Sequence, residues 1–206
     1  MNRINVIYED INIQFSDMSS DNANENMDRN EDKNADTRSR MPWKSVFINI
    51  CDTLRKRSVC LKYQTGAIVV KGTQILSIGY NGIASKQEEC SHYWENYWNR
   101  NISGVSFDDW IRTDEFRNLH SKWSVMNEIH AEVNALNWIS KGDIDNTYAI
   151  YTYYSPCEQC AKQILSYGIT QVFYCIKYLG RSASSTDGIK FLQDRGIHCE
   201  QLQVRH

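Results

Sequence analysis

The chain has 206 residues, 41% of them hydrophobic, and a formal net charge of -2 at pH 7. This length and apolar content predict one globular domain rather than two, and the slightly negative charge excludes the strongly basic field that draws long polynucleotides. No apolar run approaches the roughly 20 residues that cross a bilayer, and the N-terminus lacks the charged start and apolar stretch of a secretion signal, so we expect a soluble cytoplasmic protein with no membrane partner.

The first 40 residues form a low-complexity segment. They hold eight asparagines, nine acidic residues and five basic residues, a composition that buries too little apolar surface to fold alone. We therefore expect a disordered tail over residues 1–40 and a compact catalytic domain over residues 41–206. The opening "INVIYEDINIQF" leaves an alternative open, because its apolar residues also suit a short strand that docks on the domain or on a partner.

The compact part begins with a predicted helix and hairpin. Apolar side chains recur at helical spacing in "MPWKSVFINICDTLRKRS", and basic residues gather in its last turn, where the helix dipole favours them. The β-branched runs "TGAIVVK" and "TQILSIGY" are joined by Lys71 and Gly72, which predicts a hairpin. After "GYNG", an aromatic and polar stretch reaches about Asn127. It is long for a connection, so we expect it to be partly helical and functional.

The remainder alternates between helices and strands. We expect helices over residues 128–140, 157–167 and 187–195, and strands at "TYAIYTY", "QVFYCI" and "IHCEQLQV". This alternation predicts an α/β fold with a mostly parallel sheet that is covered by helices on both faces.

Two short motifs carry metal-ligating side chains. His130 lies at the start of the helical run in "NEIHAEVNAL", and Cys157 and Cys160 open the next predicted helix in "SPCEQC". A spacing of three puts both sulfurs on one face of the first turn, where free amides and the helix dipole stabilise thiolates. One nitrogen and two sulfurs suit zinc, and three protein ligands leave a tetrahedral position for water, as in catalytic zinc sites.

Glu132 has a different predicted role. On a helix it points about 200° away from His130 and cannot easily join the same metal, so we expect it to reach the bound water and carry protons. Each motif alone has a plainer explanation, since a C-x-x-C can be a redox pair or a chance spacing and most helical histidines are structural. H-x-E followed by P-C-x-x-C is, however, the signature of zinc-dependent deaminases.

Longer segments carry a family resemblance. "HAEVNAL", "SPCEQCAKQILSYGITQVFY", "TGAIVV" and "GYNG" resemble the deoxycytidylate (dCMP) deaminases of the cytidine deaminase superfamily, from about Met41 to about Val204. The T-even phage type is the most similar, with its "NEIHAE", its histidine in "HSKW" and its long insert after "GYNG". The resemblance implies a three-layer α/β/α fold with a central mixed five-stranded sheet. It also implies hydrolysis of dCMP to dUMP and ammonia, which supplies the dTMP precursor.

The resemblance also assigns roles to further residues. Asn81 would hydrogen-bond the sugar, the Ala131 amide would bind the base carbonyl, and Tyr178 would close over the ring; the plainer alternatives are a turn asparagine, a helical alanine and a core tyrosine. A second, structural zinc is implied, which makes two per chain, and its ligands would be Cys60, Cys90, His120 and Glu128. The other thiols, which we expect in the core, are Cys51, Cys175 and Cys199.

The substrate phosphate requires a cation or helix amides. Relatives often have an arginine where Lys62 stands, and a lysine lacks the bidentate fork of an arginine. Contact between Lys62 and the phosphate is therefore open, and Arg181 is a second candidate. Either residue could instead be a solvated surface base.

Regulation and rival activities complete the expectations. The resemblance implies a homo-oligomer, a hexamer in many relatives, that is activated by dCTP and inhibited by dTTP, with Mg²⁺ as a further partner. Deaminases of tRNA adenosine, of the riboflavin pathway or of modified cytosine nucleotides share the two motifs and remain alternatives. A zinc-stabilised binding protein is another, but it would have no use for Glu132.

Overall fold

The computed structural model describes residues 40–204, apart from residues 141, 143 and 179–187. Its central sheet has five strands, in the spatial order β2 (Gln74–Tyr80), β1 (Gly66–Lys71), β5 (Tyr148–Tyr154), β6 (Gln171–Ile176) and β7 (His198–Gln201). β1 pairs antiparallel with β2 and with β5, whereas β5, β6 and β7 are parallel. The sheet is mixed, as the resemblance implies, and half of its pairings are parallel rather than most of them.

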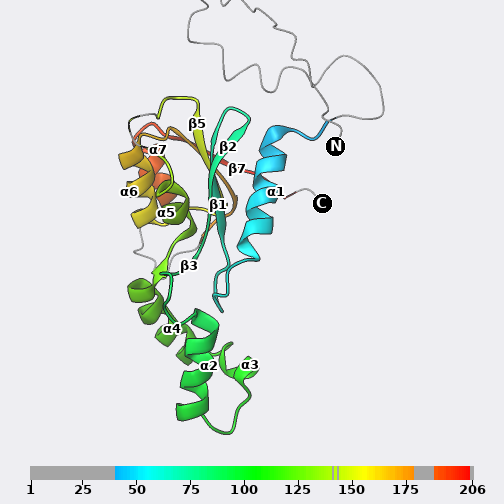
Figure 1. Cartoon of the computed structure of the whole chain (residues 1–206), viewed down its shortest axis with the longest axis vertical. Coiled ribbons are helices and arrows are strands. Elements are labelled where there is room, and N and C mark those ends of the chain that lie inside the picture. Colours follow the sequence, from blue (N-terminus) through cyan, green and yellow to red (C-terminus); the bar gives the residue numbers. More distant parts are fainter. Residues whose placement is uncertain (1–39, 141, 143, 179–187, 205–206) are drawn as a thin grey trace, which may run out of the picture. The chain divides into compact units, whose positions relative to one another are not determined.

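Helices cover both faces of this sheet and make it the middle of three layers (Figure 1). α1 (Trp43–Arg55) lies on one face. The other face is covered by α5 (Ala131–Leu136), α6 (Glu158–Tyr167) and α7 (Gly188–Gln193). The expected three-layer α/β/α fold is therefore confirmed.

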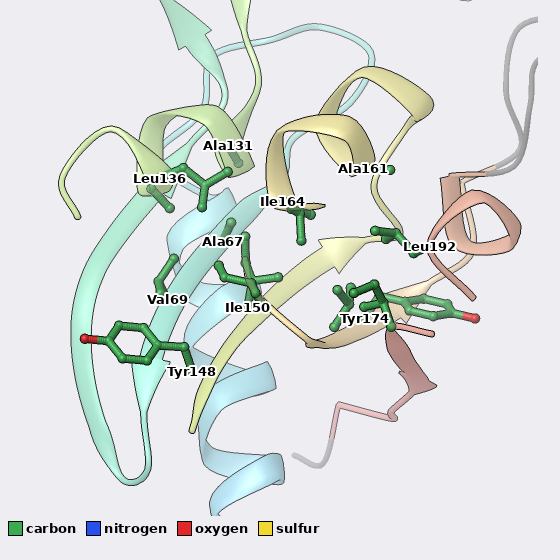
Figure 2. Packing of buried hydrophobic residues seen from close by; sticks show 14 of the residues in the cluster. Ala67, Val69, Ala131, Leu136, Tyr148, Ile150, Ala161, Ile164, Tyr174 and Leu192 are labelled. Atoms are coloured by element: carbon green, nitrogen blue, oxygen red, sulfur yellow. The ribbon is translucent and has the colours of Figure 1, made fainter. Parts of the chain in front are cut away.

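The central strand β5 is buried on both sides. Tyr151 faces α1, where its ring centroid lies 5.0 Å from that of Phe47. Its neighbour Ile150 points to the opposite layer and packs in the same cluster as Ile164 and Leu192 (Figure 2). Because successive side chains of a strand point to opposite faces, one strand serves two apolar cores, which holds its carboxyl end firmly in place.

Most of the elements that the sequence predicts are present. α1, the β1–β2 hairpin, α6, β6 and α7 all lie within the expected segments. Gly72 in the hairpin turn has φ 55°, a left-handed conformation that glycine adopts without a Cβ penalty.

The helix predicted over residues 128–140 begins later and ends earlier than expected, because α5 spans only Ala131–Leu136. Residues Glu128–Ile129 form a short strand, β4, that pairs antiparallel with β3 (Gly82–Ile83). His130 still has an extended backbone, with ψ 153°, and α5 starts only after it. The pairing with β3 supplies backbone hydrogen bonds that a helix would otherwise supply, so a pattern of apolar residues could not reveal this boundary.

The long stretch after "GYNG" is helical, as predicted. It forms α2 (Cys90–Asn101), α3 (Phe107–Trp110) and α4 (Asp114–Asn127), which lie beyond one end of the sheet (Figure 1). These helices have an aromatic core of their own, centred on Trp94, which is 2% exposed. We call residues 90–127 the insert.

Several expectations concern the remaining residues. The tail predicted over residues 1–40 lies outside the described residues except for Arg40, so the division of the chain stays a prediction. Cys51 is fully buried, whereas Cys175 and Cys199 are partly exposed. Among the helices that the structure describes, none is both long enough and apolar enough to cross a membrane.

Candidate active site and metal centres

The structure brings the first predicted metal set together. The Nδ1 atom of His130 lies 3.2 Å from Sγ of Cys160 and 3.5 Å from Sγ of Cys157. All three donor atoms lie within 4.8 Å of one another. Bonds of about 2.2 Å to a tetrahedral zinc ion separate neighbouring donors by about 3.6 Å, so these residues fit zinc.

Two helix N-termini hold these donors. His130 is the N-cap of α5 and Cys157 is the N-cap of α6, both with extended backbones. Cys160 lies in the first turn of α6 and is buried, whereas His130 is exposed. The set is therefore anchored in the core at Cys160, whereas Cys157 is only half-buried and His130 is exposed.

Two glycines allow the close packing behind this set. A Cβ atom on Gly79 of β2 would overlap the carbonyl oxygen of Ala131 and the amide nitrogen of Ala135, so α5 lies directly on the strand. A Cβ atom on Gly188 of α7 would overlap the carbonyl oxygen of Pro156, beside the cysteine turn. Any side chain at either glycine would move a segment that carries metal donors.

The charges of the set favour a thiolate. The neighbouring Cys160 and then His130 hold the pKa of the Cys157 thiol at about 4, against the effect of burial. The hydrogen bond between His130 and Cys157 in turn raises the pKa of the His130 imidazole to about 9. Negative charge is thus stabilised on a sulfur, and the thiolate is the form of cysteine that binds a metal.

Glu132 lies beside the set without joining it. Its side chain is 5% exposed and contacts Cys160, but the donors within 4.8 Å of one another include only the histidine and the two cysteines. Burial raises the pKa of its carboxyl group. A buried carboxyl with a raised pKa beside a set of three metal donors suits proton transfer.

The second predicted metal set also comes together. The Nε2 atom of His120 lies 3.5 Å from Sγ of Cys60 and 3.4 Å from Sγ of Cys90, and a Glu128 oxygen joins them within 4.8 Å. These residues come from the loop before β1, from α2, from α4 and from β4. The donor spacing again suits one tetrahedral ion.

Burial of this second set favours a closed site. Both cysteines and His120 are 3% exposed, and the His120 ring packs against Trp94 and Phe116 of the insert. Burial, assisted by Cys60, raises the pKa of the Glu128 carboxyl to about 8. Its Oε1 atom is buried and has no hydrogen-bond partner among the described residues. A carboxylate in this setting is stabilised by a bound cation.

The residues predicted to bind substrate have differing surroundings. Asn81 donates from Nδ2 to the Tyr63 carbonyl at 2.7 Å and accepts the Thr65 amide at 2.9 Å, so its side chain holds the loop before β1. Ala131 is buried at the start of α5. Tyr178 follows β6, and its ring centroid lies 5.5 Å from that of Tyr63.

Only one of the two candidate phosphate ligands lies among the described residues. Arg181 lies outside the described residues. Lys62 lines a surface pocket of about 560 Å³ that also includes Arg55, Gln64 and Tyr154. Partial burial lowers the pKa of Lys62, and the nearby Arg117 adds to this effect. Arg55 is paired with Asp52 at 2.7 Å, so Lys62 is the cation of this pocket that is better suited to an anionic group.

Tyr63 is a neighbour of the candidate site that sequence reasoning missed. Its ring contacts Tyr178 and also Tyr154, at a centroid distance of 5.7 Å. It stands directly after Lys62, and only the tertiary fold brings it to the end of β6. No local motif marks such a residue: its place between the candidate metal donor Cys60 and the "TGAIVV" strand does not show which distant ring it contacts.

Comparisons with known proteins agree with this geometry. Residues 41–176 match the family model "Cytidine and deoxycytidylate deaminase zinc-binding region". A deoxycytidylate deaminase of Enterobacteria phage T4 is 33% identical over 150 residues, which cover 65% of this chain and 78% of that protein. A deoxycytidylate deaminase of Schizosaccharomyces pombe is 26% identical over 164 residues, which cover 80% of this chain and 45% of that protein.

Solved structures give the same result. The dCMP deaminase of cyanophage S-TIM5 in complex with dCMP and dUMP superposes with a TM-score of 0.54 at 26% identity. The match covers 80% of this chain and all of that one. The motifs, the fold and the matching relatives all lead to one assignment: the chain belongs to the cytidine and deoxycytidylate deaminase family.

Proposed function

We propose that the protein is a deoxycytidylate deaminase, which hydrolyses dCMP to dUMP and ammonia and so supplies the precursor of dTMP. The observation that carries this proposal is the buried Glu132 carboxyl next to three donors of the kind that hold a catalytic zinc. Relatives named deoxycytidylate deaminases and the relative solved with dCMP and dUMP support the choice of substrate.

The chemistry requires an activated water and a proton carrier. His130, Cys157 and Cys160 would hold the zinc ion, which would supply a Lewis acid that makes water nucleophilic near neutral pH. Glu132 accepts the proton of the attacking water and delivers it to N3 of the cytosine ring while the water oxygen bonds to C4. Glu132 then carries the remaining proton of the new C4 hydroxyl to the amino group, the C4 carbonyl forms as the C4–N bond breaks, and ammonia leaves.

Other residues orient the nucleotide in this proposal. The Ala131 amide binds the base carbonyl, and Tyr178 packs over the ring. Asn81 binds the sugar through hydrogen-bonding capacity that remains after its contacts with the loop before β1, because an amide oxygen accepts two hydrogen bonds and its nitrogen donates two. Lys62 contacts the phosphate from its pocket, and Arg181 is a second phosphate ligand.

A second zinc has a structural role in the proposal, which gives two zincs per chain. Four donors from separate segments leave no position for water, so this ion would hold the insert to the sheet. We further propose a homo-oligomer, hexameric as in many relatives, with dCTP as activator and dTTP as inhibitor, each with Mg²⁺. Native mass measurement with and without each nucleotide tests this part.

Ammonia release from the purified protein tests the activity. The substrates are dCMP, cytidine, dCTP, a 5-substituted dCMP and tRNA, and Glu132→Gln serves as the inactive control. We expect release from dCMP at a kcat/KM at least tenfold above that for the other compounds. Preferred release from tRNA or from the 5-substituted nucleotide would replace the proposed substrate, and no release from any of them would favour a binding protein.

A further inference from the structure

Ser155 is a buried serine that joins the cysteine turn to the segment after β6. It follows the last residue of β5 and is 3% exposed. Its backbone N–H donates to the Ile176 carbonyl at 2.8 Å, and its Oγ accepts the Tyr178 backbone N–H at 2.8 Å. Cys157 is only two residues further along the chain. One side chain thus connects the start of a metal-binding turn with the aromatic residue beyond β6.

The Tyr178 ring belongs to a closed circuit of contacts. It makes an edge-to-face contact with the Tyr63 ring at an interplanar angle of 79°, and the Tyr63 ring makes a similar contact with that of Tyr154 at 88°. Tyr154 is bonded to Ser155, which returns to Tyr178 through the hydrogen bond. The Tyr63 end is fixed in turn by Asn81, which binds its carbonyl group. Two of these links are edge-to-face ring contacts, which tolerate a range of geometries. The hydrogen bond is therefore the most directional link between these residues.

We propose that Ser155 is a positioning residue: its hydroxyl fixes the Tyr178 ring relative to the Cys157 turn, so that the cytosine base binds in one orientation above the reacting centre. The inference rests on the proposed deaminase function. A serine that merely satisfied a backbone N–H at the end of a strand would affect stability whether or not an aromatic ring stood at position 178. A serine that positions the ring matters to the substrate only while the ring is present.

The first test is Ser155→Ala with Ser166→Ala as a matched control. Ser166 is an exposed serine whose hydroxyl donates to the Gln163 carbonyl within its own helix. We expect Ser155→Ala to raise KM for dCMP about tenfold, the effect of one hydrogen bond whose donor is left unpaired, with a smaller change in kcat and unchanged zinc content. Ser155→Thr keeps the acceptor and should restore most of the affinity. Ser166→Ala should leave KM unchanged.

A double-mutant cycle with Tyr178→Ala decides between positioning and mere structure. In the Tyr178→Ala background the added Ser155→Ala change should alter KM less than twofold, because the ring that the hydroxyl orients is already gone. If the effects of the two substitutions on KM are independent and multiply in the double variant, the inference is overturned. A Ser155→Ala variant with normal KM, or one that has lost its zinc, would overturn it too.

Hydrogen exchange of the wild-type protein covers the case in which Ser155→Ala does not fold. The Tyr178 amide should exchange at least tenfold more slowly than a free amide, and unprotected exchange would overturn the inference without any variant. The wild-type assay separates the two proposals. If the wild type releases ammonia from dCMP but the effects of the two substitutions on KM multiply, only the role of Ser155 is disproved. If the wild type releases no ammonia from dCMP, the proposed function is disproved, and this inference with it.

Discussion

At the scale of single residues, position relative to the candidate metal donors distinguishes the roles proposed for two carboxylates. Glu132 and Glu128 are both largely buried, and burial raises the pKa of each. Glu128 stands within 4.8 Å of three other donors, whereas Glu132 stands beside a set of three that is complete without it. The same type of side chain is therefore suited to hold an ion at position 128 and to move protons at position 132.

This difference predicts the behaviour of Glu132→Gln. We expect the variant to keep its zinc and its melting temperature and to lose on the order of a thousandfold in kcat, because the amide cannot carry the proton. Zinc content, melting and ammonia release are measured together. Glu158→Gln, which changes a surface carboxylate paired with Lys162, should be fully active. Loss of zinc from Glu132→Gln would instead identify Glu132 as a ligand.

The sequence allowed prediction of the residues whose chemistry depends on local spacing. Cys157 and Cys160 are one helical turn apart, so their joint placement follows from the helix alone. Tyr63 could not be predicted, because its contact with Tyr178 spans more than a hundred residues and depends on the sheet. The two backbone bonds of Asn81 were also hidden, since nothing in "GYNG" shows which loop lies opposite.

At the scale of elements, the packing of α5 on β2 positions the Glu132 carboxyl. The backbones meet at Gly79, and Asn134 of α5 donates to the Tyr80 carbonyl at 2.9 Å. We predict that Gly79→Ala pushes α5 away, costs about 1–3 kcal/mol of stability and lowers kcat by more than tenfold. Gly82→Ala is the control for melting, because a Cβ atom there has open space. Equal melting and turnover in the two variants would contradict this account of the packing.

The two metal sets predict opposite orders of failure. Cys157→Ser should abolish activity and lower the melting temperature only moderately, since three layers already pack around that site. Cys90→Ser should lower the melting temperature strongly, because it frees the insert from the sheet, and activity should fall as a consequence. Metal analysis should give two zincs per chain in the wild type and one in each variant. A Cys90→Ser protein with normal melting and turnover would remove the second zinc.

The boundary of α5 shows where prediction of elements fails. The apolar spacing in "NEIHAEVNAL" predicts a helix from residue 128, yet Glu128 and Ile129 pair with β3 instead. Local pattern determines which residues can be helical, whereas strand pairing with a distant segment determines where the helix begins. The later start leaves His130 at the N-cap, with its ring free to turn toward the cysteines.

At the scale of the whole molecule, the compact part carries every element that the proposed reaction uses. Among the described residues, all seven candidate metal donors and Glu132 lie between residues 60 and 160, and the match to the family model begins at residue 41. The first 40 residues are rich in asparagine and charge. A segment of that composition has little apolar surface with which to stabilise a fold.

Deletion of residues 1–40 is therefore predicted to leave the enzyme nearly unchanged. We expect kcat/KM for dCMP within about twofold of the full chain and a melting temperature within about 2 °C, because the candidate metal donors, Glu132 and the described core clusters all lie after residue 40. Activity, melting and native mass are measured on both proteins. A matched deletion of residues 16–40 keeps the apolar opening "INVIYEDINIQF" and removes only the polar stretch. If only the longer deletion lowers stability or native mass, the opening segment docks on the domain or on a second subunit, and the predicted boundary at residue 40 is wrong.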